Sequence, residues 1–184
     1  VYHYTTRYDS RSGIIGTEDI DITIRNVAHK SITLSKIAPD STPLLGAKYK
    51  LVYTASDEDE DDGFDSVISN DWVEKTGCTV NSDNQLVDAS GKVIDITAQG
   101  IYQLYETSAP DGYITPKDEN GDPILLATIT VDGQDEMTVE VNSGYNGYAD
   151  YLTDAEVTDA GTVCSFTLIN DPVTAYFGKT IDFA

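Results

Sequence analysis

The sequence predicts an all-β sandwich, and three observations lead to that fold class. Apolar and polar residues alternate with a period of two in most segments of the 184-residue chain, which is the pattern of strands with one buried face. Clusters of Gly, Pro, Asp and Asn separate these segments, as turns do between short strands. No long apolar period of 3.6 residues occurs, although residues 148–157 are compatible with a short helix.

The alternation predicts strands in the following order along the chain: 20–24, 32–34, 49–53, 101–105, 124–131, 137–141 and 163–169. Three segments break the rhythm and are predicted to be loop insertions: 55–63, 70–98 and 143–161. We therefore expect a sandwich domain over residues 30–173. An N-terminal strand segment, 1–29, and a C-terminal strand tail, 174–184, have no place in a closed sandwich.

Two interpretations of these end segments remain open. Residues 1–29 can be the last part of a preceding module, with Asn26 where its final strand would end. Alternatively, one of the two end segments donates a strand to the next subunit of a filament, because an exposed sheet edge accepts an extra strand.

The charge of the chain excludes several classes of partner. Lys and Arg number 11 against 32 Asp and Glu, which gives a net charge of -21. A field of this sign repels nucleic-acid phosphates and anionic membrane surfaces. No segment approaches the roughly 20 apolar residues that a membrane helix needs, so no membrane insertion is predicted. The length suits one domain with a substantial core.

The histidines and cysteines give no sign of a metal site, a cofactor or an enzyme. With only His3 and His29 available, a zinc cluster cannot be built, and hydrolysis by a serine or cysteine has no nearby base. We predict no cofactor and no activity on an external substrate. Cys78 and Cys164 are compatible with a disulfide or with two buried thiols that act as small apolar residues.

The acidic run at 57–62 is a weak candidate for calcium binding. Its carboxylates have the charge density of a calcium loop but not the spacing of an EF-hand. A solvated loop is the alternative. The candidate ligands are Asp57, Asp59 and Asp61.

A group of tyrosines in the segment 143–161 is a candidate ligand patch. Tyr145, Tyr148 and Tyr151 alternate with Gly, Asn and Asp, so they can form an exposed surface for a host glycan or matrix protein. Alternatively, they anchor a long insertion against the sandwich.

Three segments together resemble one family. They are SITLSKIAPDSTPLLGAKYKLVY at 31–53, IYQLYETSAPDGY at 101–113 and CSFTLINDP at 164–172. In this order they are similar to the opening strand, the central glutamate strand and the closing strand of Cna B-type domains, the SpaA-like pilin and collagen-adhesin stalk modules of Gram-positive surface proteins. The resemblance implies an immunoglobulin-like or transthyretin-like β-sandwich.

The resemblance also implies an intramolecular isopeptide bond. Carried over residue by residue, it implies Lys36 as nucleophile, Asn170 as electrophile and Glu106 as the proton shuttle. Burial lowers the pKa of an amine and raises that of a carboxyl group, so adjacent Lys and Glu side chains can both be neutral. A neutral amine can attack an amide carbon, and a protonated Glu106 would hydrogen-bond the Asn170 carbonyl oxygen and relay protons.

The resemblance implies an extracellular, cell-surface protein that crosslinks itself once and turns over no substrate. Its partners would be neighbouring modules or subunits of the same fibre. Two alternatives to this stalk role are kept: an adhesin module that binds a host glycan or matrix protein, and a subunit of a filament assembled by strand donation.

Overall fold

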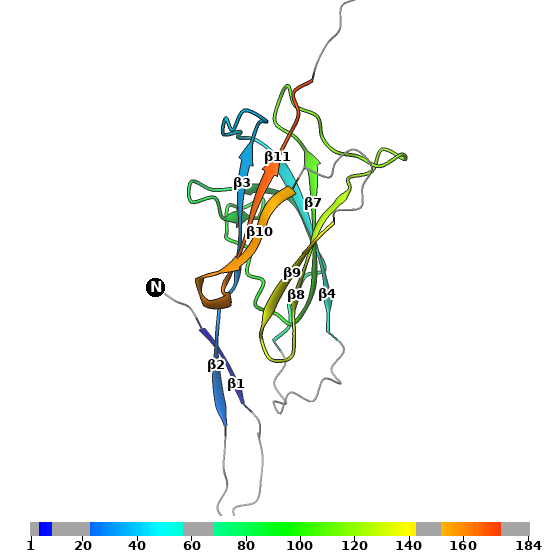
Figure 1. The fold of residues 1–184 in the computed structure, drawn as a ribbon. Coiled ribbons are helices and arrows are strands. Elements are labelled where there is room, and N and C mark those ends of the chain that lie inside the picture. Colours follow the sequence, from blue (N-terminus) through cyan, green and yellow to red (C-terminus); the bar gives the residue numbers. More distant parts are fainter. Residues whose placement is uncertain (1–3, 9–22, 57–67, 143–151, 174–184) are drawn as a thin grey trace, which may run out of the picture.

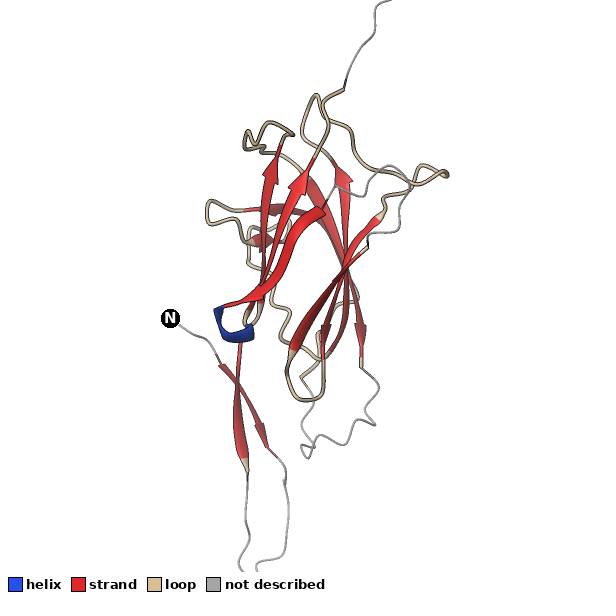
Figure 2. Cartoon of the chain, in the orientation of Figure 1, coloured by secondary structure: helices blue, strands red, loops and turns tan. Residues whose placement is uncertain are grey.

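A computed structural model describes residues 4–8, 23–56, 68–142 and 152–173 of the chain. The described strands are β1 (Tyr4–Tyr8), β2 (Ile24–Ala28), β3 (Ser31–Ile37), β4 (Lys48–Ala55), β5 (Glu74–Val80), β6 (Leu86–Val87), β7 (Gly100–Ser108), β8 (Leu125–Val131), β9 (Met137–Val141), β10 (Leu152–Thr158) and β11 (Val163–Ile169). One short 3-10 helix, η1 (Asp159–Gly161), precedes β11. The predicted all-β class is confirmed (Figure 2).

Two sheets form the sandwich. The smaller sheet has the strand order β10-β11-β3, and the larger has the order β6-β5-β4-β7-β8-β9. Figure 1 shows β3, β10 and β11 on one side and β4, β7, β8 and β9 on the other. Within the small sheet, β3 and β11 run parallel, whereas the pairs of the large sheet are antiparallel. The first and last strands of the domain are therefore direct neighbours.

The core lies between the two sheets because each strand turns alternate residues inward. Burial alternates along the whole of β3 and β11, and along β7 as far as Thr107. The small sheet contributes Ile32, Leu34, Leu152, Cys164, Phe166 and Leu168 to the core, and the large sheet contributes Tyr49, Leu51, Tyr53, Cys78, Leu86, Tyr102, Leu104, Leu126, Ala127, Ile129, Val131 and Met137. Burial of this apolar surface is the main force that holds the sheets together.

Two predictions about the interrupting segments were wrong. Residues 70–98 are not a loop insertion: they contain β5 and β6, which extend the large sheet, and they supply Ile94 and Ile96 to the core. In the predicted insertion 143–161, the described residues 152–157 are neither a loop nor a helix, because β10 spans them and pairs with β11. The rhythm breaks here because these strands are short or bulged.

The cysteines are two free, buried thiols. Cys78 lies on β5 in the large sheet and Cys164 on β11 in the small sheet. The disulfide is therefore not formed in the structure, and the alternative of small apolar core residues describes both side chains.

Strands β1 and β2 form a separate antiparallel hairpin in the part of the chain that the structure describes. The hairpin docks on the turn between β8 and β9 through Arg7, which is fully buried. Nη1 of Arg7 donates to the carbonyl oxygen of Gly133 at 3.1 Å and to Oδ2 of Asp135 at 3.2 Å. These contacts join the hairpin to one end of the sandwich (Figure 1).

Across the described residues, no helix combines the length and the apolar character needed to cross a membrane.

Candidate functional site

Three strands each place one polar side chain in the apolar core. Lys36 is near the end of β3, Glu106 is on β7, and Asn170 directly follows β11. Each stands two residues after a buried leucine, so the period-two alternation turns it toward the same interior. The three leucines are Leu34, Leu104 and Leu168.

Strand pairing brings these side chains to one place. In the parallel pair β3–β11, Lys36 lies opposite Leu168, and the backbone N–H of Asn170 donates to the carbonyl oxygen of Ile37 at 3.1 Å. Glu106 approaches from the facing sheet. The structure thus brings together three residues that are up to 134 positions apart in the sequence.

The carboxylate of Glu106 contacts both of the other side chains. Its Oε2 accepts a hydrogen bond from Nζ of Lys36 at 2.8 Å and from Nδ2 of Asn170 at 3.4 Å. The Lys36 and Glu106 side chains are 2% and 0% exposed, and Asn170 is fully buried. The predicted proton shuttle therefore contacts both the predicted nucleophile and the predicted electrophile, and all three side chains are shielded from water.

Burial shifts both ionisable groups toward their neutral forms. Desolvation lowers the pKa of the Lys36 amine to about 8, against the opposing effect of the nearby Glu106 carboxylate. Desolvation also raises the pKa of the Glu106 carboxyl group, again against the effects of Lys36 and Asn170. A neutral amine beside a neutral carboxyl group is the protonation state that nucleophilic attack on an amide requires.

One contact differs from the sequence-based expectation. Glu106 was expected to hydrogen-bond the carbonyl oxygen of Asn170, whereas its Oε2 contacts the amide nitrogen. The same nitrogen donates to the carbonyl oxygen of Ile114 at 2.9 Å. The carboxyl group is thus placed to pass a proton to the nitrogen that would leave, instead of polarising the carbonyl oxygen.

Two contributors to the site were missed by the sequence reasoning. Tyr49 pairs with Glu106 across β4 and β7, and its hydroxyl is buried with no hydrogen-bond partner among the described residues. Burial, and secondly the charge of Glu106, raise the pKa of Tyr49. The alternation in β4 predicts an inward Tyr49, but only the register of the strands places it beside Glu106. The Ile114 carbonyl is a backbone group, so no residue type in the sequence could have predicted its contact with Asn170.

The other predicted sites fall outside the described residues. The calcium candidates Asp57, Asp59 and Asp61 lie in the segment 57–67, and the tyrosine patch of Tyr145, Tyr148 and Tyr151 lies in 143–151. Among the residues that are described, no group of three or more His, Cys, Asp or Glu side chains is arranged to hold a metal ion.

The sequence matches one protein-family model. The family model of SpaA, described as a prealbumin-like fold domain, matches residues 30–144. No curated protein matches the chain.

The chain is also similar to solved structures. A C-terminal fragment of the pilus adhesin SpaC from Lactobacillus rhamnosus GG has 20% identity, with 84% of this chain and 51% of that chain covered and a TM-score of 0.48. The same adhesin in an open conformation has 21% identity, with 84% and 16% covered and a TM-score of 0.49. The pilus 2b backbone protein of group B streptococcus has 21% identity, with 86% and 47% covered and a TM-score of 0.39. The chain thus spans about half or less of the length of these proteins.

Proposed function

The chain belongs to the SpaA family of prealbumin-like fold domains, and on that premise we propose that it is a structural module of a Gram-positive cell-surface pilus or adhesin. An isopeptide bond between Lys36 and Asn170 would clamp the module. The observation that carries this proposal is the buried contact of Glu106 with both side chains, at 2.8 Å to Lys36 Nζ and 3.4 Å to Asn170 Nδ2.

The proposed reaction balances without any external reagent. The lone pair of the neutral Lys36 amine attacks Cγ of Asn170, so the Nζ–Cγ bond forms and the Cγ–Nδ2 bond breaks. Glu106 takes one proton from the attacking amine and delivers one to the departing nitrogen, which leaves as ammonia. The product is a secondary amide, formed once per molecule. Because Lys36, Glu106 and Asn170 would react only with one another and only once, the module would not be an enzyme with turnover.

The position of the bond supports a mechanical role. β3 is the first strand of the domain and β11 the last, and they are parallel neighbours. Tension applied through the two ends would enter β3 at Ser31, cross from Lys36 to Asn170 and leave at Asp171. Everything between residues 37 and 169 would carry no load. The link would also resist reduction, unlike a disulfide.

The separate N-terminal hairpin supports a modular arrangement. β1 and β2 pair with each other and dock on the sandwich through side chains, as the last hairpin of a preceding module would do. On this interpretation residues 1–29 end a neighbouring module and residues 30–173 form the clamped one. The partners would then be modules or subunits of the same fibre at the cell surface.

The intact mass of the denatured and reduced chain tests the proposal. We expect the wild type to be lighter than its sequence mass by one ammonia, and Lys36→Ala and Asn170→Ala to show no deficit. A Lys50→Ala variant is the control, because this lysine of β4 is only part-buried and lies outside the cluster. A wild-type mass equal to the sequence mass would remove the crosslink and with it the clamped-stalk function.

A further inference from the structure

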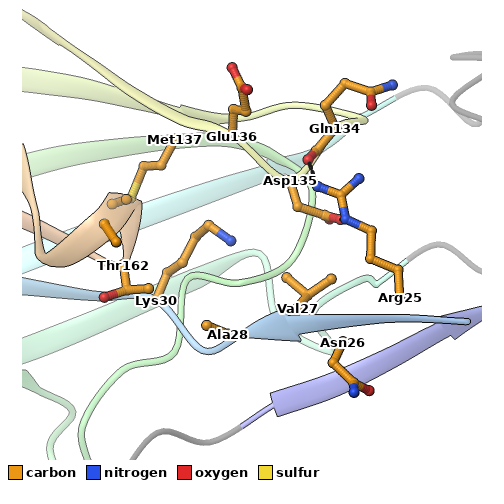
Figure 3. A pocket seen from close by; sticks show the side chains of 12 residues that line it. Arg25, Asn26, Val27, Ala28, Lys30, Gln134, Asp135, Glu136, Met137 and Thr162 are labelled. Atoms are coloured by element: carbon orange, nitrogen blue, oxygen red, sulfur yellow. Dashed lines mark hydrogen bonds and ion pairs between the residues drawn. The ribbon is translucent and has the colours of Figure 1, made fainter.

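A pocket lies where the N-terminal hairpin meets the sandwich, away from the Lys36 cluster. Its volume is about 390 Å³. β2 and the residues after it form one wall, the β8–β9 turn forms a second, and the segment that includes Thr162 forms a third (Figure 3). The basic side chains in its lining are Arg25 and Lys30.

Lys30 is the unexplained group in this pocket. The residue is 4% exposed, and its backbone is held by bonds from its N–H to Thr97 Oγ1 at 2.8 Å and from the Ile96 N–H to its carbonyl oxygen at 3.0 Å. Figure 3 shows its side chain extending into the pocket. Among the residues that the structure describes, its Nζ has no hydrogen-bond acceptor and no ion-pair partner. Desolvation lowers the pKa of this amine, so an anion in the pocket would stabilise its charged form.

The acidic side chains around Lys30 are engaged elsewhere. Asp135 binds Arg7 at 3.2 Å and Arg25 at 3.4 Å, and it also accepts a bond from Gln99 at 3.3 Å. The carboxylate of Glu136 points away from the Lys30 amine in Figure 3.

Two further carboxylates influence the Lys30 amine from a distance and are also occupied. Asp95 binds His29 at 2.6 Å, and Asp132 accepts the backbone N–H groups of Gln134 and Glu136, each at 2.9 Å. The Lys30 ammonium is thus left with an open pocket in front of it and no committed counter-charge.

We infer that this pocket binds a carboxylate group, with the Lys30 ammonium as the main ligand and the Arg25 guanidinium as the second. Arg25 is suited to that position because its side chain is 35% exposed and retains donors beyond those that bind Asp135 and the Gln134 carbonyl oxygen. A singly charged anion is favoured over phosphate or sulfate, because the surrounding carboxylates and the net charge of -21 oppose a second negative charge. The carboxylate can belong to a small free acid or to an Asp or Glu side chain of a polypeptide. The inference uses none of the clamp residues and does not depend on the proposed crosslink.

The single methionine of the chain provides a reporter, because Met137 lines the pocket. The Met137 methyl resonance is followed by NMR while sodium acetate replaces sodium chloride at constant ionic strength. We expect a saturable shift with acetate and none with acetamide, its neutral counterpart. Lys30→Gln should weaken acetate binding by about tenfold or more, whereas Lys92→Gln, at an exposed turn, should leave it unchanged.

Arg25→Gln is the second variant, and it keeps the test decisive if Lys30→Gln disturbs folding. It should raise the acetate dissociation constant about threefold or more. The inference is overturned by no saturable shift up to about 0.1 M acetate, by an equal shift with acetamide, or by unchanged binding in a folded Lys30→Gln or Arg25→Gln variant. A blocked Ala-Glu-Ala peptide identifies the source: binding about tenfold tighter than acetate supports a polypeptide carboxylate, and equal binding supports a free acid.

Discussion

Replacing Glu106 by Gln is expected to prevent the crosslink while preserving the shape of the core. Glutamine fills the same fully buried position but cannot take up and return a proton. The crosslinked positions 36 and 170 are 134 residues apart, and the chain-entropy relation for a loop of this length gives a stabilisation of about 5 kcal/mol. For a domain of this size, roughly 2–4 °C correspond to each kcal/mol, so the melting temperature should fall by about 10–20 °C.

A second effect of the same substitution has to be separated from the first. In the Glu106→Gln chain, the Lys36 amine remains buried without its carboxylate, which destabilises the fold independently of the lost crosslink. A double variant, Lys36→Met with Glu106→Gln, removes the amine as well. Its melting temperature relative to the wild type therefore isolates the effect of the crosslink.

The assay combines calorimetric melting with the intact mass of the same denatured samples. Glu140→Gln on β9 is the matched control, because this glutamate is exposed and its loss should change neither quantity. A Glu106→Gln chain that still lacks one ammonia would refute the role of Glu106 as the proton shuttle. A double variant without the crosslink that melts within about 3 °C of the wild type would refute the loop-closure argument.

Three further predictions concern the core and its ionisable groups. The crosslinking rate of freshly refolded chain, followed by mass, should be highest where the Lys36 and Glu106 pair holds one shared proton. It should fall about tenfold per pH unit above roughly pH 8, where the pair loses that proton, and fall again in acid, where a second proton leaves Lys36 charged beside a neutral Glu106; a rate that keeps rising to pH 10 would contradict this. Gly100→Ala should lower the free energy of unfolding, measured by urea denaturation, by about 1–3 kcal/mol or more, because φ is +143° and the added Cβ would overlap a carbonyl oxygen of β4; an unchanged free energy would contradict the described backbone. Burial raises the pKa of Cys78 to about 11 and that of Cys164 to about 12, so a thiol reagent at about pH 8 should label neither cysteine in the folded chain and both after denaturation.

The strand alternation predicted much of the fold, and the resemblance to Cna B-type domains predicted the candidate cluster. The alternation predicted the all-β class and most of the strands, because the two-residue period of a strand is a local property of the backbone. The roles of Lys36, Glu106 and Asn170 came from the resemblance. The three motifs then indicated the family that the chain belongs to. Whether the crosslink forms stays a prediction.

Other features were decided only by the tertiary structure. Three features depend on which distant segments lie side by side. They are the parallel pairing of β3 with β11, the position of Tyr49 beside Glu106, and the hydrogen bond that the Asn170 amide donates to the Ile114 carbonyl oxygen. Local periodicity carries no information on that arrangement.

The same limit explains why 70–98 was taken for an insertion and why the junction of hairpin and sandwich was missed. β6 is two residues long, too short for a period to be seen, yet it adds an edge to the large sheet and buries Leu86. Arg7 and Asp135 are 128 positions apart and each is ordinary in its own segment. The sequence by itself determined which residues face inward along each strand, because that follows from backbone geometry. Only the packing of whole sheets and hairpin decided which inward groups meet, because burial and pairing are properties of the folded chain.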